Sequence, residues 1–150
     1  MQTIWKPHAT VAAIIERDGK FLIVEEQIRG KPVFNQPAGH LEPGESLIEA
    51  AIRETREETA WGFTPEFVTG VYRWPQADTE RTFLRIAFSG SCHDYNEGQA
   101  LDDGIIKATW MSRDELAAQP EKLRSIMVLQ CIDDYLSGKR FSLDLLVDVV

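Results

Sequence analysis

The sequence is poor in cysteine and in long apolar runs, and each scarcity excludes a class of protein. Its two cysteines, Cys92 and Cys131, form no C-x-x-C pair, so we expect neither a disulfide framework nor a zinc cluster. No apolar run approaches the roughly 18–20 residues of a membrane-spanning helix, and no basic-then-apolar signal segment opens the chain. We therefore expect a cytoplasmic protein without a membrane partner.

Positive charge is also scarce. Sixteen Lys and Arg residues stand against 24 Asp and Glu residues, which gives a formal net charge of −8. Long nucleic acids are held mainly through basic contacts to their phosphates, so we expect no such partner here. A small anionic substrate is compatible with this charge where a metal ion supplies the positive charge locally.

Length and hydrophobic patterning predict one mixed α/β domain over residues 1–150, as a monomer or homodimer. Short β-rich runs between turn signals predict strands at 11–15, 21–24, 33–36, 67–74, 81–89 and 105–111. Helical periodicity predicts helices from residue 46 to about residue 60, at 113–118 and at 123–136. The segments 38–45 and 90–104 are predicted loops.

The first helix has a defined start and a predicted buried stripe. Ser46 followed three residues later by Glu49 is typical of a capping box. Four residues at helical spacing form the stripe: Ile48, Ile52, Thr55 and Thr59. The apolar side of the last helix is predicted to carry Ile126, Leu129, Ile132, Tyr135 and Leu136.

Three carboxylates gather on another face of the first helix. Glu54, Glu57 and Glu58 have i, i+3 and i+4 spacing and fall within an arc of roughly 100°. Like charges at these spacings destabilise a helix by about 0.2–0.5 kcal/mol per pair, a cost that a bound cation would offset. Oxygen ligands of this kind suit Mg²⁺ or Mn²⁺. On charge pattern alone, a solvated surface face remains the commoner alternative.

Neighbouring residues favour a cation site. Ala50, one turn before Glu54, would leave room for a metal and its waters. Arg53 lies four residues before Glu57 and can pair with it. The glycine-bearing segment from Ala38 onward can bring backbone carbonyls beside the helix.

The order of these residues resembles the signature box of the Nudix hydrolases. That box has a glycine, five residues, a glutamate, seven residues, and then Arg-Glu-apolar-x-Glu-Glu-x-Gly-apolar. Six of its seven fixed identities are present: Gly39, Glu45, Arg53, Glu54, Glu57 and Glu58. Two positions depart from it, because Ala60 replaces the last glycine and Thr55 replaces an aliphatic residue. Ala60 in a left-handed backbone would cost about 1 kcal/mol; alternatively, Gly62 ends the helix.

The resemblance implies an α/β/α sandwich with a central mixed β-sheet and Mg²⁺-dependent cleavage of a phosphoanhydride bond. It implies that Glu54, Glu57, Glu58 and the backbone carbonyl of Ala38 hold the metal. It also implies that Glu45 and Arg53 are catalytic residues that orient this set, although some members use the glutamate matching Glu45 directly in catalysis. Our first choice for the general base is Glu54. The alternatives are Glu57 and three acidic residues of the predicted second loop: Glu97, Asp102 and Asp103.

A finer resemblance links the chain to the NudJ-type phosphatase branch of the family. It is carried mainly by Asn35-Gln36-Pro37-Ala38-Gly39-His40-Leu41-Glu42 and by Phe83-Leu84-Arg85. This branch implies hydrolysis of nucleoside di- and triphosphates and of a thiamine-precursor pyrimidine pyrophosphate. Expected substrate contacts are Gly39, His40 and Arg85, the last as a bidentate grip on a terminal phosphate or else as a surface residue. Candidate stacking residues are Trp5, Phe34, Tyr72 and Trp74.

Two other functions remain open. A different Nudix specificity would act on ADP-ribose, dinucleoside polyphosphates or oxidised nucleotides. A non-catalytic nucleotide-binding module is less favoured, because the box glutamates are intact and the length leaves no room for a second domain.

Overall fold

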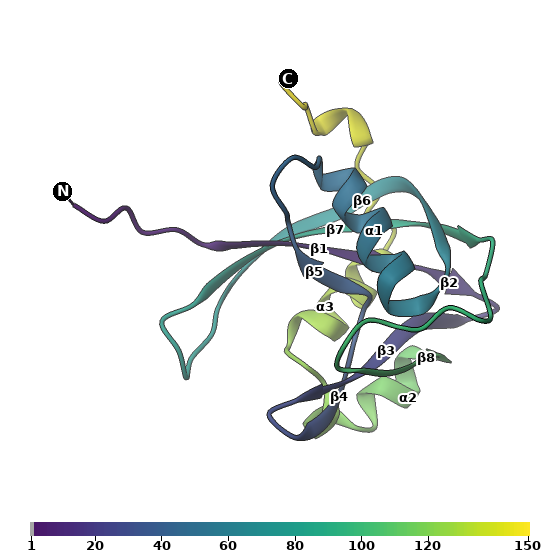
Figure 1. Ribbon diagram of the computed structural model, residues 1–150. Coiled ribbons are helices and arrows are strands. Elements are labelled where there is room, and N and C mark those ends of the chain that lie inside the picture. Colours follow the sequence, from purple (N-terminus) through teal and green to yellow (C-terminus); the bar gives the residue numbers. More distant parts are fainter. Residues whose placement is uncertain (1) are drawn as a thin grey trace.

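The computed structural model describes residues 2–150, which form two β-sheets with helices packed against them (Figure 1). The strands are β1 (His8–Ile14), β2 (Glu16–Arg17), β3 (Lys20–Ile28), β4 (Lys31–Asn35), β5 (Ala38–His40), β6 (Gly62–Pro75), β7 (Thr82–His93) and β8 (Ile105–Met111). The α-helices are α1 (Leu47–Thr59), α2 (Arg113–Ala117) and α3 (Met127–Leu136), with short 3-10 turns at η1 (Pro120–Lys122) and η2 (Leu143–Leu145). None of the helices in this part of the chain is long and apolar enough to cross a membrane.

The first sheet is mixed and has the strand order β5-β1-β7-β6. Strand β1 runs parallel to β7, from the pair His8–Phe83 to the pair Ile14–Ser89, and the other pairings are antiparallel. The second sheet is antiparallel, with β3 between β4 and β8 and with β2 joined to the start of β3. The predicted central mixed sheet is confirmed, and a separate antiparallel sheet lies beside it.

The two faces of β1 contact different helices, as the alternation of side chains along a strand requires. Val11 and Ala13 belong to the core cluster that includes Ala50 of α1. Ile14 belongs to the other cluster, with Ile132 of α3. Figure 1 shows α1 and α3 on opposite sides of this strand. The predicted α/β/α sandwich is therefore confirmed.

Two predicted loops are partly strand. The segment 90–104 was expected to be irregular, but β7 continues to His93, which pairs with Gly62 at the start of β6. The loop is thus only 94–104, because this distant partner satisfies the backbone of a polar stretch. Likewise, residues 38–40 form β5, in which His40 pairs with Thr10 of β1.

The prediction of one helix over 123–136 is wrong at its start. Helix α3 begins at Met127, and the preceding residues are held by a tertiary contact, since the Arg124 N–H donates to the Phe34 carbonyl at 2.8 Å. Ile126 and Leu136, which were expected on the apolar side, are exposed. The helical spacing of apolar residues could not reveal that this backbone pairs with β4.

The start of α1 is as predicted, but its buried face is rotated. Ser46 and Glu49 form the capping box. Ile52 is exposed, whereas Ala50 and Ala51 are buried in the core, so the predicted stripe is wrong at residue 52. The room that Ala50 was expected to leave for a metal is therefore filled by the core. Two small alanines allow the helix to approach the sheet closely, which a stripe of isoleucines would not.

Helix α1 ends at Ala60, which adopts a left-handed conformation with φ = 65°. Its N–H donates to the Arg56 carbonyl at 3.0 Å, and Gly62 already belongs to β6. The first of the two expected helix ends is thus the observed one. The alanine occupies a backbone conformation that favours glycine by about 1 kcal/mol.

Candidate active site

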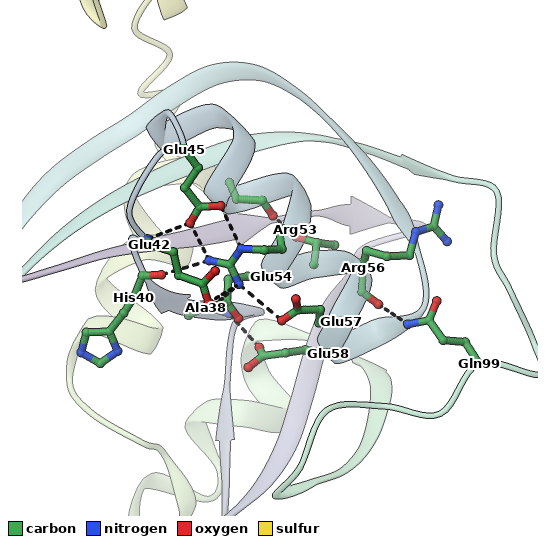
Figure 2. Close-up of polar contacts among 12 residues, drawn as sticks. Ala38, His40, Glu42, Glu45, Arg53, Glu54, Arg56, Glu57, Glu58 and Gln99 are labelled. Carbon is green, nitrogen blue, oxygen red and sulfur yellow. Dashed lines mark hydrogen bonds and ion pairs between the residues drawn. The ribbon is translucent and has the colours of Figure 1, made fainter. Parts of the chain in front are cut away.

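Arg53 lies at the centre of the carboxylate face of α1 (Figure 2). Its guanidinium makes a two-point contact with Glu45, with N–O distances of 2.9 and 2.7 Å. It also donates to Glu54 at 2.9 Å, to Glu57 at 3.3 Å and to the carbonyl of His40 at 3.1 Å. The Arg53–Glu57 pair expected from i, i+4 spacing is present, but the contact between Arg53 and Glu45 is the shortest. Hydrogen bonds from Arg53 lower the pKa of Glu45.

Glu58 is buried at the junction of α1 and β5. Its side chain accepts a hydrogen bond from the Ala38 N–H at 2.9 Å, and the residue is 7% exposed. Burial raises the pKa of Glu58 to about 9, and the negative charges of Glu54, Glu26 and Asp102 add to this rise. The Ala38 N–H opposes the rise but does not cancel it. Glu58 is therefore protonated near neutral pH when no cation is bound.

Glu54 is 8% exposed and is pressed against the backbone of β5. A Cβ on residue 39 would overlap the Glu54 carboxylate, so Gly39 is needed for this close approach. Burial raises the pKa of Glu54, although Arg53 opposes the shift. The alternative that these glutamates form a solvated face is therefore wrong for Glu54 and Glu58.

The donor set fits a hard divalent cation. The Glu58 carboxylate contacts the Ala38 backbone, and Arg53 links the carboxylates of Glu54 and Glu57. Oxygen-only donors of this kind suit Mg²⁺ or Mn²⁺. In the chain from residue 2 onward, however, no three acidic, histidine or cysteine side chains converge closely enough to hold an ion as they stand. The Arg53 guanidinium instead bridges Glu54 and Glu57, so a cation would have to draw these carboxylates together.

The loop 94–104 brings one further acid to this face. The Asp102 N–H donates to the Glu57 carbonyl at 2.9 Å, and the charge of Asp102 contributes to the raised pKa values of Glu54 and Glu58. Glu97 and Asp103 are exposed residues of the same loop and make no such contribution. Of the three acidic loop residues considered from the sequence, Asp102 is the one beside the helix carboxylates.

A small pocket of about 190 Å³ opens beside the carboxylate face. It is lined by residues from both sheets, from the segment before α3 and from the first residue of that helix: Thr10, Glu26, Ile28, Asn35, Ala38, Gly39, His40, Trp74, Phe83, Arg85, Arg124, Ser125 and Met127. Ala38 and Gly39 therefore lie between this pocket and the glutamates. The expected substrate residues Gly39, His40 and Arg85 all line it.

Arg85 is a buried cation at this pocket, not a surface arginine. It is 3% exposed, and its terminal nitrogens donate to the amide oxygens of Gln36 at 2.9 Å and Asn35 at 3.1 Å. Its Nε has no hydrogen-bond partner, and no carboxylate within residues 2–150 forms an ion pair with it. The neutral amides fix the guanidinium without cancelling its charge.

Residues 6–129 match the sequence profile of the NUDIX domain. The chain belongs to the Nudix hydrolase family. It is 41% identical to the Phosphatase NudJ of Escherichia coli K12 over 97% of this chain and 94% of that protein. A NUDIX hydrolase from Nitrosomonas europaea has 50% identity and a TM-score of 0.94, covering 96% of this chain and 98% of that one.

A more distant structural neighbour shows the fold alone. It is a bifunctional NMN adenylyltransferase/ADP ribose pyrophosphatase from Francisella tularensis, complexed with AMP and a manganese ion. Its TM-score is 0.73 at 21% identity, covering 91% of this chain and 43% of that one.

The family profile and the identity to Phosphatase NudJ confirm the resemblance to the Nudix family and to NudJ. The protein is an enzyme that hydrolyses acid anhydrides of phosphorus.

Sequence reasoning missed two charged residues of this Nudix pocket. Glu26 lies on β3, and burial raises its pKa, although Arg124, Asn35 and Arg85 oppose the shift. Arg124 lies before α3 and also lines the pocket. A local signal was Asn35-Gln36, two adjacent amides at the end of β4, which suggest a polar network but do not identify its partners.

The four candidate stacking residues lie in different parts of the structure, and not all of them line the pocket. Trp74 lines the pocket and stacks on Phe83, with ring centroids 5.6 Å apart and an interplanar angle of 22°. Trp5 is exposed and Phe34 is buried in the core. Tyr72 is turned away, and its hydroxyl donates to Asp134 at 2.8 Å. Of the four, only Trp74 lines this pocket.

Proposed function

We propose that this Nudix hydrolase uses Mg²⁺, with Mn²⁺ as a substitute, to cleave a phosphoanhydride bond in nucleoside di- and triphosphates. We propose that it also acts on a thiamine-precursor pyrimidine pyrophosphate and that residues 1–150 form one Nudix domain. The observation that carries the proposal is the pair of buried carboxylates, Glu54 and Glu58, packed beside a pocket that holds the unneutralised Arg85. The similarity to Phosphatase NudJ supports the substrate class.

Metal binding is assigned to Glu54, Glu57, Glu58 and the carbonyl of Ala38. When bound, the ion would neutralise phosphate charge and lower the pKa of a bound water. Arg53 already holds Glu54 and Glu57 in hydrogen-bond contact, so it limits the geometries that these ligands sample.

Proton transfer is assigned to Glu54, which takes the proton of the attacking water. Glu57 and Asp102 are the alternative bases, because Glu57 lies on the same face and the Asp102 N–H is bound to the Glu57 carbonyl. A positioned general base typically contributes about 10²–10⁴-fold in rate. Glu45 is a positioning residue, because its two-point contact with Arg53 fixes the guanidinium, which in turn holds Glu54 and Glu57.

Substrate binding is assigned to Gly39, His40 and Arg85. The fixed charge of Arg85 attracts a terminal phosphate, and Trp74 offers a flat surface to a ring. At about 190 Å³, the pocket is smaller than the roughly 300–1,000 Å³ of typical drug-sized sites. It therefore suits one small end of a substrate better than the second nucleoside of a dinucleotide.

A substrate panel tests the proposal. It should include nucleoside di- and triphosphates, the pyrimidine pyrophosphate, ADP-ribose, a dinucleoside polyphosphate and an oxidised nucleotide. With Mg²⁺, nucleoside diphosphates should give orthophosphate and a monophosphate, and chelator should abolish turnover. Reaction in ¹⁸O-labelled water locates the attacked phosphorus by mass spectrometry.

Three results would overturn different parts of the proposal. Far better turnover of ADP-ribose or of a dinucleoside polyphosphate would replace the substrate assignment and leave the metal assignment intact. Full turnover in excess EDTA would remove the metal assignment. Nucleotide binding without hydrolysis of any panel member would favour the non-catalytic module.

A further inference from the structure

A second and larger cavity lies beneath the loop 94–104, at the C-terminal end of α1. Its volume is about 410 Å³, within the range of small-molecule sites and about twice that of the pocket beside the carboxylates. Its walls come from the end of α1, from the loop and from β8, and they share no residue with the active-site pocket.

Aromatic rings dominate one side of this cavity. The Trp61 and Tyr95 ring centroids are 4.8 Å apart at 38°, and those of Trp61 and Trp110 are 6.3 Å apart at 80°. Tyr95 is 52% exposed, and both tryptophans are only partly buried. Accessible aromatic faces around a concave space favour a planar ring as the ligand, because offset stacking adds to the burial of apolar area.

One cation lines this cavity and another lies beside its aromatic rings. The Arg17 guanidinium lies over the rings of Trp61 and Trp110, 4.9 and 5.4 Å from their centroids, and donates to the Cys92 carbonyl at 3.2 Å. Lys107 lines the cavity itself. Throughout residues 2–150, neither side chain forms an ion pair. Lys107, which lines the cavity without an ion pair, can meet one anionic group of a ligand there.

We propose that this cavity is a second binding site, which takes a planar heteroaromatic ring that carries a negative charge. A nucleoside monophosphate has this chemistry: its base would stack on the exposed ring of Tyr95 beside the two tryptophans, and its phosphate would lie near Lys107. The binding itself does not rest on the proposed hydrolysis of nucleotides.

The loop connects this site to the carboxylate face. The Gln99 amide donates to the Arg56 carbonyl at 2.6 Å (Figure 2), and the Asn96 N–H donates to the Ala60 carbonyl at 2.9 Å. The Asn96 N–H pairs a carbonyl at the helix end that the helix itself leaves free, and the Gln99 amide is a second donor to the Arg56 carbonyl, which already accepts from the Ala60 N–H. Because Gln99 also lines the cavity, a bound ligand stabilises the docked loop and with it the position of Asp102 beside Glu57. This coupling does rest on the proposed function.

Binding is tested by NMR on the ¹⁵N-labelled full chain in EDTA, with AMP as the probe. The indole N–H signals of Trp61 and Trp110 should shift in a saturable way, whereas the Gly39 amide reports separately on the active-site pocket. Ribose 5-phosphate, which lacks the ring, should leave both indole signals unmoved. Unmoved indole signals at millimolar AMP would overturn the proposal, whatever happens at Gly39.

Variants separate the contributions of the ring and of the charge. Tyr95→Ala should weaken the AMP response of the indoles by about fivefold, whereas the matched Tyr95→Phe should retain it. Lys107→Ala should weaken binding of AMP but not of adenosine. An equal affinity of wild-type, Tyr95→Ala and Lys107→Ala proteins would place the ligand elsewhere. If the indoles respond but no panel substrate is hydrolysed, the second site stands and the proposed function fails.

Discussion

Glu58→Gln is the perturbation that most directly tests the electrostatics of the site. In the metal-free protein the pKa of Glu58 is about 9, against an ordinary value of 4.5, because the carboxyl is buried. Between these two values the folded state holds a proton that the unfolded state has released. The free energy of unfolding therefore falls as pH rises from about 5 to about 9. Glutamine cannot titrate, and its amide oxygen can still accept the Ala38 N–H.

The size of the effect follows from the shift. The difference of about 4.5 pKa units, at roughly 1.4 kcal/mol per unit, sets a ceiling of about 6 kcal/mol between the two ends of this window. At pH 5 the wild type and the variant should differ little. At pH 9 in EDTA, Glu58→Gln should be more stable by several kcal/mol, a large share of the about 5–15 kcal/mol of a typical domain.

The assay is denaturant unfolding in EDTA at pH 5, 7 and 9, with exposed Glu66→Gln as the matched control. The control should follow the wild type at every pH. Adding Mg²⁺ should restore stability to the wild type at high pH and help Glu58→Gln much less. Parallel pH curves for wild type and Glu58→Gln would refute the claim that Glu58 is protonated in the metal-free fold.

Three further predictions concern the same helix. Glu57→Gln keeps the side-chain shape but removes a charged ligand, so kcat should fall at least about 10²-fold, or 2.7 kcal/mol of barrier; a wild-type rate would exclude Glu57 as a ligand. Calorimetric titration of Mg²⁺ at pH 8, repeated in two buffers with different ionisation enthalpies, should show that binding releases about one proton. Identical binding heats in the two buffers would contradict this. Ala60→Gly relieves about 1 kcal/mol of backbone strain but loses a buried methyl worth about 0.8 kcal/mol, so the free energy of unfolding should change by less than about 0.5 kcal/mol. A larger change in denaturant unfolding, in either direction, would contradict this balance of strain and burial.

Local features of α1 were predictable from the sequence because their causes are local. The capping box of Ser46 and Glu49 depends on spacing within one turn, and so does the contact between Arg53 and Glu57. The mixed sheet and the α/β/α layers were implied by the family resemblance and are confirmed.

The burial of the site was not predictable in this way. Glu58 looks like a surface glutamate by spacing, and it is buried because β5 closes over it in a segment predicted as loop. Arg85 and Glu26 come from strands far apart in the chain, and only the pairing of strands brings both to one pocket. The misplaced start of α3 has a similar origin, since the contact between Arg124 and Phe34 is tertiary.

The metal-free face of α1 balances its charge in two different ways, and this difference bears on function. Glu45, Glu54 and Glu57 share the single guanidinium of Arg53, whereas Glu58 lies beyond its reach and keeps a proton instead. A divalent cation would replace that proton and weaken the hold of Arg53 on Glu54 and Glu57, while the two-point contact with Glu45 anchors the arginine. In the proposed mechanism, Glu45 therefore matters because it keeps Arg53 in place when the other carboxylates turn to the metal.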